Sequence, residues 1–276
     1  MTGLPELTVL LGPQTQLALA MNAHLRENRL YLAKHGITAL PSRLASPILR
    51  ASVDERPEDE RLAQFAEKTA PRPAILSAIN MFGPPEAGLL KGELFPDAEL
   101  KFAGLAPVVG SARVVIFIDA LPSFFIAAKS ETLEDRVRRT SWEVLYELGW
   151  FELLSELVEF LPDAQFTVVS GKVPGDELAR LPEALIGPQS DSLPSPFAFL
   201  QNLITETGRA VLARILERGA PDAATIADLY TSFARRPTPD DLRDRLGIDK
   251  LTGILLDQRF EEDIEKLSTF PRVTVF

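Results

Sequence analysis

The run ARVVIFIDA, residues 112–120, constrains the fold of this chain more than any other stretch. Its centre is apolar without alternation and rich in β-branched side chains. A strand with no polar face is buried on both sides, which is typical of a parallel sheet covered by helices. The segment therefore predicts a central strand of such a sheet.

Three other short apolar runs have the same character: LTVLL at 7–11, PAILSAI at 73–79 and QFTVVSG at 165–171. Helical periodicity lies between them. The expected helices are 14–35, 58–69, 100–109, 124–129, 133–146, 150–160 and 177–185. Strands that alternate with helices predict an α/β fold, with three layers and a parallel sheet flanked by helices.

The last third of the chain is expected to be mainly helical and part of one domain, 1–276, whose α/β core is 1–187. The stretch PQSDSLPSP, 188–196, predicts a linker or exposed loop. The expected helices after it are 197–218, 222–235, 239–246 and 249–268. Residues 37–40 are expected to be extended, and the final RVTVF fits either a last short strand or a tail.

Composition excludes several classes of protein. A net charge of −10 argues against a nucleic-acid surface, which needs clustered Lys and Arg. No apolar run reaches the roughly 18 residues of a membrane helix, and the first residues do not look like a signal peptide. We expect a cytoplasmic protein without nucleic-acid or membrane partners. The chain has no cysteine, which excludes disulfides and thiol chemistry.

Metal binding is not expected either. The two histidines, His24 and His35, are 11 residues apart in one helical pattern, which is too far to share a metal ion. A position on the surface or at a helix end is predicted for both. The acidic run Glu261–Asp263 is predicted to be a solvated helix face.

The segment after the first strand has the layout of a phosphate-binding loop, in which backbone N–H groups and a helix start face an anion. Gly12 permits the turn, but Pro13 removes a donor, and Gln14, Thr15 and Gln16 are neutral. The residues alone favour a strand–turn–helix unit with no ligand. The remaining backbone donors leave an anion site as the alternative.

Residues 12–37, GPQTQLALAMNAHLRENRLYLAKHGI, resemble the start of the bacterial P-loop sulfotransferase-like proteins. That family typically has a Gly-Pro-x-Lys-Thr-Gly-Thr-Thr loop and then a helix with Asn-Arg and a Gly-Ile ending. The matching residues are Gly12, Pro13, Leu25, Asn28, Arg29, Gly36 and Ile37. The Lys-Thr-Gly-Thr-Thr positions hold Thr15, Gln16, Leu17, Ala18 and Leu19. The helix framework is similar, and the phosphate-binding set is replaced.

A second segment, ARVVIFIDALPSFFIAA at 112–128, is similar to the family's strand that ends in an arginine gripping the cofactor's 3′-phosphate. Here that position is Asp119, and the family's assisting serine falls near Ala127. A carboxylate would repel phosphate by about 1 kcal/mol or more in a partly desolvated cleft. The residues also offer Asp119 a structural role, capping the next helix through the amides of Ser123 or Phe124.

Residues 141–172 and 260–276 extend the resemblance, with Arg272 where the family has glycine, while 40–72 and 188–250 add little. The resemblance implies the P-loop sulfotransferase-like fold and an ancestral donor, 3′-phosphoadenosine 5′-phosphosulfate. It does not imply that this chain uses that donor. The degenerate cofactor positions are Gly12, Pro13, Gln14, Thr15, Gln16 and Asp119.

Three further residues are candidate ligand contacts because they follow strands at the expected active edge of the sheet. Ser77 and Asn80 end the second buried run and suit a small polar ligand, although no histidine is placed to activate Ser77. Lys172 follows the fourth run and suits an anion, with a surface loop lysine as the alternative. No catalytic residue is assigned.

Several aromatic residues from Trp142 to Phe160 are expected to be mostly core, and any exposed stripe would be a surface for a protein partner or a second copy. Two losses in separate parts of one cofactor site favour a catalytically degenerate, sulfotransferase-like binding or interaction module, with no cofactor. The alternatives are a divergent sulfotransferase that uses the ancestral donor and a protein that binds another small molecule in the same cleft.

Overall fold

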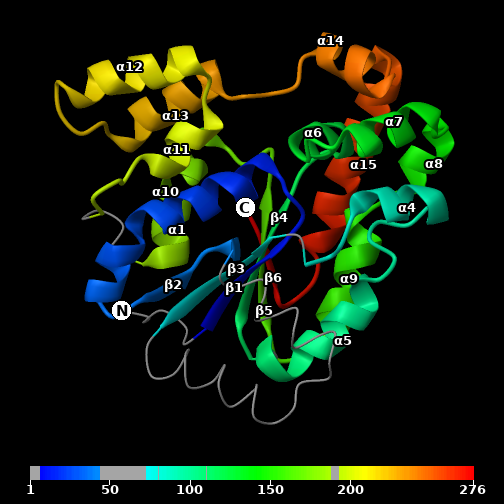
Figure 1. Cartoon of the computed structure of the whole chain (residues 1–276), viewed down its shortest axis with the longest axis horizontal. Coiled ribbons are helices and arrows are strands. Elements are labelled where there is room, and N and C mark those ends of the chain that lie inside the picture. The colour runs from blue at the N-terminus through cyan, green and yellow to red at the C-terminus, as the bar shows by residue number, and fades with distance from the viewer. Residues whose placement is uncertain (1–6, 44–72, 80, 110, 188–192) are drawn as a thin grey trace.

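The computed structural model describes residues 7–43, 73–79, 81–109, 111–187 and 193–276, which form an α/β arrangement (Figure 1). Six parallel strands form one sheet in the order β2-β3-β1-β4-β5-β6. They are β1 (Leu7–Gly12), β2 (Thr38–Leu40), β3 (Ala74–Ile79), β4 (Arg113–Ile118), β5 (Gln165–Ser170) and β6 (Val273–Val275). The predicted parallel α/β fold class is confirmed.

The central strands have the two-sided burial that their sequences predict. All six residues of β3 are buried, as are Val114 to Ile118 of β4. Successive side chains point to opposite faces of a strand, so this burial requires helices on both faces of the sheet. The C-terminal RVTVF proves to be a strand: β6 pairs with β5 at the edge of the sheet.

One face of the sheet is covered by α1 (Gln16–Lys34), whose buried residues Leu17, Met21, Leu25 and Leu32 follow helical spacing. Its predicted end at Gly36 is confirmed, because Gly36 has a φ of 79°, which glycine adopts readily. The same layer contains α10 (Gly175–Ile186), α11 (Ala198–Leu203), α12 (Glu206–Leu216) and α13 (Ala223–Phe233). Within it, α1 packs on α11 and α10 packs on α13.

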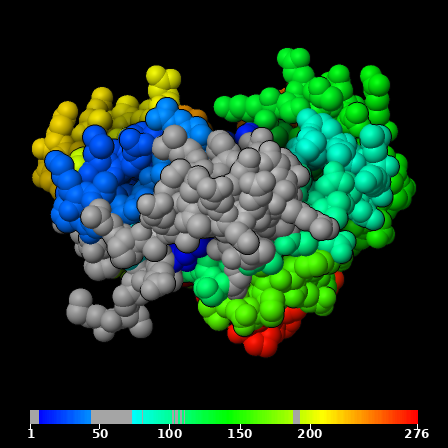
Figure 2. All heavy atoms as spheres, turned by 60° about the horizontal axis from the view of Figure 1, so that its bottom comes forward, coloured from blue at the N-terminus to red at the C-terminus, as the bar shows by residue number. Residues whose placement is uncertain are grey.

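The other face carries a second helical layer around an aromatic cluster of Phe95, Phe124 and Trp150. Its helices are α4 (Pro85–Lys91), α5 (Ala98–Val109), α6 (Leu121–Ala127), α7 (Glu131–Arg139), α8 (Trp142–Glu147), α9 (Trp150–Phe160) and α15 (Lys250–Leu267). In the space-filling view, α1 (blue) and α5 and α9 (cyan-green to green) lie on opposite sides of the molecule (Figure 2). The sheet thus has helices on both faces.

Two long predicted helices are each divided where a polar residue takes the N-cap position of a new helix, and only Thr205 makes a side-chain capping bond there. The pattern over 133–146 separates into α7 and α8 around Thr140 and Ser141. The pattern over 197–218 separates at Thr205, whose side chain accepts a bond from Gly208 N. The residues of 239–246 form α14 (Pro239–Asp241) and the π-helical turn η2 (Leu242–Leu246). The predicted helix 58–69 lies outside the described residues.

Two surface predictions are wrong because the residues are buried in the core. His24 is 0% exposed within α1, whereas His35 is exposed at the end of that helix, as predicted. Asp263 is 1% exposed, whereas Glu261 and Glu262 form the expected solvated face. Among the described helices, none combines the length and apolar character needed to cross a membrane.

Candidate functional site

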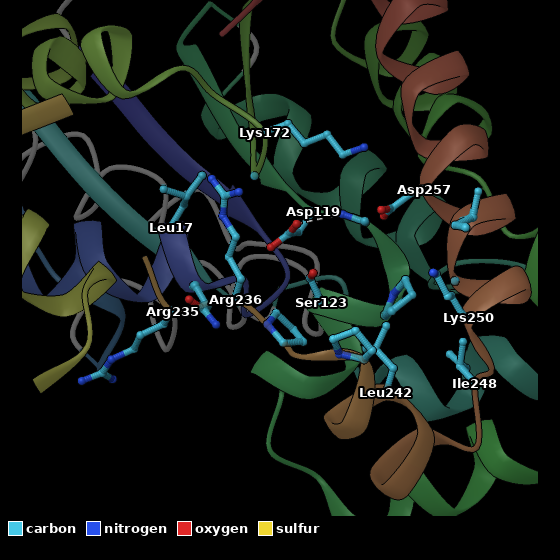
Figure 3. A pocket seen from close by; sticks show the side chains of 18 of the residues that line it. Leu17, Asp119, Ser123, Lys172, Arg235, Arg236, Leu242, Ile248, Lys250 and Asp257 are labelled. Atoms are coloured by element: carbon cyan, nitrogen blue, oxygen red, sulfur yellow. Dashed lines mark hydrogen bonds between the residues drawn. The ribbon is translucent and has the colours of Figure 1, made fainter. Parts of the chain in front are cut away.

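A cavity of about 520 Å³ opens at the C-terminal edge of the sheet. Gln16, the first residue of α1, lines its wall. The loops after β4 and β5 contribute Asp119 and Lys172, and Arg236 and Asp257 come from the last third of the chain (Figure 3). The direction of strand order changes between β1 and β4, and ligands of open α/β sheets bind outside the strand ends at such a switch point. The volume suits a small molecule.

The loop between β1 and α1 has the backbone of a tight turn, and its threonine is buried. Gly12 has a φ of 123°, which strongly favours glycine. Thr15 is fully buried, and its hydroxyl accepts a hydrogen bond of 3.1 Å from Ala18 N as the cap of α1. The Thr15 hydroxyl is therefore used as the N-cap of α1.

The predicted loop residues are divided between two cavities. Gln16 faces the large cavity, whereas Pro13 and Gln14 line a separate one of about 360 Å³ beside Glu86 and Phe124. The six degenerate cofactor positions do not all face one cavity. Of the set, the large cavity brings together only Gln16 and Asp119.

Asp119 follows β4 and does not cap α6, so the predicted capping bond to Ser123 or Phe124 is wrong. Its Oδ1 accepts a 2.9 Å hydrogen bond from Ala120 N. Ala120 itself is the N-cap residue and makes no side-chain capping bond, and Phe124 N donates to the Ala120 carbonyl. The helix begins at a Leu-Pro pair, which suits a first turn without a capping side chain.

The protein environment raises the pKa of Asp119 from 3.8 to about 7. Burial is the main cause, since desolvation disfavours the carboxylate, and the negative charge of Asp257 raises the pKa further. The Ala120 N–H, Lys172 and Arg236 act in the opposite direction. Near neutral pH this carboxyl group therefore exchanges readily between its charged and neutral forms. A strongly perturbed acid in a cleft is a common mark of a functional site.

Lys172 lines the cavity, but its ammonium group is already paired. Its Nζ lies 2.7 Å from Glu261 Oε1 and 5.9 Å from the centre of the Phe260 ring, both on α15. The pair is half exposed, and such a pair adds little stability. The assignment of Lys172 to an anionic ligand stays a prediction.

The other two candidate contacts do not join this cavity. Ser77 is fully buried in β3, with its hydroxyl 3.0 Å from that of Ser42, and it does not line the wall. Asn80 lies outside the described residues. The Ser77 hydroxyl therefore makes a contact inside the protein and does not face the cavity.

The sequence interpretation missed the residues contributed by the segment between α13 and α14. We call residues 234–238 the strap, because they cross the top of the sheet between the two helical layers (Figure 1). Arg235 anchors it, donating from its backbone N to Leu203 O and from Nε to Ile204 O, each at 2.8 Å. The usable signal was the sequence Arg-Arg-Pro between two helical patterns, because proline prevents one continuous helix there.

Arg236, the next strap residue, turns into the cavity, where its Cζ lies 6.0 Å from the centre of the Tyr230 ring. The ion pairs formed among the described residues do not include Arg236. The same is true of Lys250 and Asp257 on α15, which also line the cavity. The cavity thus contains ionic side chains without ionic partners.

Within the described part of the chain, no three His, Asp or Glu side chains gather closely enough to hold a metal ion. Comparison with protein-family models, curated proteins and solved structures gives no match. The site is therefore interpreted from its own geometry and chemistry.

Proposed function

We propose that this chain is a catalytically degenerate, sulfotransferase-like protein that binds a small molecule in the cavity at the sheet edge and transfers no sulfonate group. The observation that carries the proposal is the position of Asp119. At the place where the resembling family has a phosphate-gripping arginine, this chain presents a partly shielded carboxyl group to the cavity.

The electrostatics of Asp119 oppose a polyphosphorylated donor. Two like charges 4 Å apart near a protein surface repel each other by about 4 kcal/mol. The β1–α1 loop offers little compensation, because Pro13 lacks an N–H, Thr15 uses its hydroxyl as a cap, and the loop has no cation. Both elements that would hold the donor are therefore unsuited to it.

The cavity favours a small ligand over a protein partner as the main occupant. Large exposed apolar side chains among the described residues are spread over several helices, namely α1, α4, α5, α8 and α15. Scattered exposure of this kind is normal and does not by itself mark an interface. A partner or second copy on the helical surface is the less supported form of the binding-module proposal.

A divergent sulfotransferase is the second candidate, and the charges of Arg236 and Lys250 favour it. Both cations face the cavity without an ionic partner among the described side chains, and a donor with several phosphate and sulfate oxygens would use them. In this case the strap would replace the lost loop lysine as the source of positive charge.

The two candidates are separated by calorimetric titration with 3′-phosphoadenosine 5′-phosphate at low salt, where charge interactions are strongest. We expect no detectable heat from protein that shows a cooperative unfolding transition. A micromolar Kd that is lost in Arg236→Met but retained in the exposed α12 control Arg214→Met would overturn the degenerate-site proposal and support the sulfotransferase.

A further inference from the structure

The charged side chains of the cavity divide into those already used by the protein and those left over. Lys172 is paired with Glu261, the Arg235 Nε is bonded to Ile204 O, and Asp249 caps α15 through Thr252 N. The remaining lining charges are two cations, Arg236 and Lys250, and two acids, Asp119 and Asp257. Asp119 accepts a hydrogen bond from Ala120 N and Arg236 lies over the Tyr230 ring, but none of the four forms an ion pair with another described residue. The charge that lacks an ionic partner is therefore mixed in sign.

These four groups come from different elements that meet at the cavity. In Figure 3, Asp119 and Arg236 lie next to each other, while Asp257 and Lys250 project from α15 on the opposite wall. Arg236 is close enough to lower the pKa of Asp119, yet the two side chains form no ion pair within 4.0 Å. The space between them suits a ligand that presents a hydrogen-bond donor to one group and an acceptor to the other.

The rest of the wall is largely apolar. Leu17 from α1, Leu203 from the end of α11, and Leu242, Ile248 and Ile254 around η2 and α15 line it, together with prolines of the strap and α6. A pocket with apolar walls and a few converging polar groups fixes the orientation of a ligand that has an apolar body and a polar end.

We infer that the cavity binds a small zwitterion of the amino-acid class, with its ammonium group toward Asp119 and Asp257, its carboxylate toward Arg236, and its apolar side chain against the leucine and isoleucine wall. A carboxylate suits the planar guanidinium of Arg236, which offers two parallel N–H donors. This inference rests on the proposed function, because it assumes that the cavity has an occupant other than the sulfonate donor.

The test uses three probes with the same apolar body and different charge. L-Phenylalanine is zwitterionic, 3-phenylpropionate has only the carboxylate, and 2-phenylethylamine has only the ammonium group. Titration at pH 7.5 is expected to give at least tenfold tighter binding of L-phenylalanine than of either single-charge probe. Equal binding of L-phenylalanine and 3-phenylpropionate, or no binding of L-phenylalanine at 10 mM, would overturn the inference.

Two substitutions assign the charges to residues. Asp119→Asn should weaken the binding of L-phenylalanine and of 2-phenylethylamine about tenfold and should leave the binding of 3-phenylpropionate no weaker. Arg236→Met should weaken the binding of L-phenylalanine and of 3-phenylpropionate and leave that of 2-phenylethylamine unchanged. The matched control variants are Asp228→Asn on α13 and Arg214→Met on α12. Both residues are exposed and lie outside the cavity wall, so these variants should bind all three probes as the unmodified protein does.

The wild-type probe series decides the inference even where a cavity variant fails to fold. The titrations also distinguish a failure of this inference from a failure of the proposed function. If L-phenylalanine does not bind and 3′-phosphoadenosine 5′-phosphate also gives no heat, the zwitterion is excluded and the degenerate donor site stands. A micromolar Kd for 3′-phosphoadenosine 5′-phosphate that is lost in Arg236→Met and retained in Arg214→Met instead excludes the proposed function itself.

Discussion

The Asp119 side chain occupies the space beside Gly171 where any other residue would place its Cβ. A Cβ built on Gly171 would lie 2.5 Å from Asp119 Cγ, well inside van der Waals contact. The two residues follow β4 and β5, which are neighbours in the sheet. The absence of a side chain at Gly171 thus lets the Asp119 carboxyl group sit at the cavity wall.

The substitution Gly171→Ala should therefore displace Asp119 and break its bond from Ala120 N. We expect a loss of about 1–3 kcal/mol in the free energy of unfolding, as for other overpacked sites. Urea unfolding of the single variants and of Gly171→Ala with Asp119→Ala measures the coupling between the positions. An equal cost of Gly171→Ala in both backgrounds would contradict the contact.

The raised pKa of Asp119 predicts that Asp119→Asn stabilises the protein at alkaline pH. The folded-state pKa of about 7 exceeds the ordinary value of 3.8, so the folded state binds more protons between these values. Stability due to this residue is therefore present below pH 4 and is lost as the pH rises through 7. Burial is the main cause of the raised pKa, and the titratable or charged groups that interact with the carboxyl group are Asp257, Lys172, Arg236 and Tyr230.

Thermal unfolding of Asp119→Asn at pH 4 and pH 8 tests this prediction. At pH 8 we expect a gain on the order of 1–3 kcal/mol, because part of the carboxylate faces the cavity and its desolvation is incomplete. At pH 4 the gain should be near zero. Asp228→Asn, which removes an exposed acid, serves as the control, and a gain at both pH values would argue against a buried charge as the cause.

The sheet could be predicted from the sequence because its strands are continuous apolar runs, and ARVVIFIDA and QFTVVSG contain β4 and β5 as expected. The division of the long helices was harder to predict. Thr205 is one polar residue within a long helical pattern, and its role as a cap depends on Ile204 pairing with Ala234 far along the chain. Local periodicity contains no information on that long-range contact.

The cavity was predictable only on the side formed by the strand ends. Asp119 and Lys172 follow buried strands, so the parallel topology places them at one edge. Arg236 and Asp257 come from a strap and a helix, and nothing in their local sequence points toward the sheet. Their meeting with Asp119 depends on how the strap crosses between the two helical layers.

The burial of His24 predicts that the protein loses stability in mild acid. Its ring is fully buried on α1, neither ring nitrogen has a hydrogen-bond partner among the described residues, and burial lowers its pKa to about 4. The unfolded state binds a proton near pH 6.5 and the folded state does not, so the stability contributed by His24 is complete above pH 6.5 and is lost as the pH falls toward 4. The slope is at most about 1.4 kcal/mol per pH unit.

The variant His24→Leu should flatten this pH dependence between pH 6.5 and 4, measured as the midpoint of urea unfolding. Leucine fits the apolar surroundings, which include the Phe199 ring, whose centre lies 6.5 Å from that of His24. The control His35→Gln changes an exposed histidine and should keep the wild-type slope. A His24→Leu curve parallel to that of the unmodified protein would place the acid sensitivity elsewhere.

Asp263 connects α15 to the start of α9, and its loss should be the most damaging of the changes considered. Its Oδ2 accepts a 2.7 Å hydrogen bond from Trp150 N, and its Oδ1 lies 3.1 Å from Arg259 Nη1. Asp263 is 1% exposed, so its removal leaves the Trp150 N–H without an acceptor and takes away one acidic partner of Arg259, which keeps Glu152 at 2.8 Å. We expect Asp263→Ala to cost about 3 kcal/mol of unfolding free energy, the lower end of the range for a broken buried ion pair.

Asp263→Asn separates the two contributions, because asparagine retains an acceptor for Trp150 N but loses the charge that faces Arg259. Its cost should be smaller than that of Asp263→Ala, because the acceptor for Trp150 N is kept. In an Arg259→Met background both costs should fall, because the lost ion pair no longer counts, while the difference between them should remain. Urea unfolding at pH 7 of the single and double variants gives these values. Equal costs for asparagine and alanine would show that the bond to Trp150 N contributes little and that the ion pair with Arg259 determines the stability of the junction.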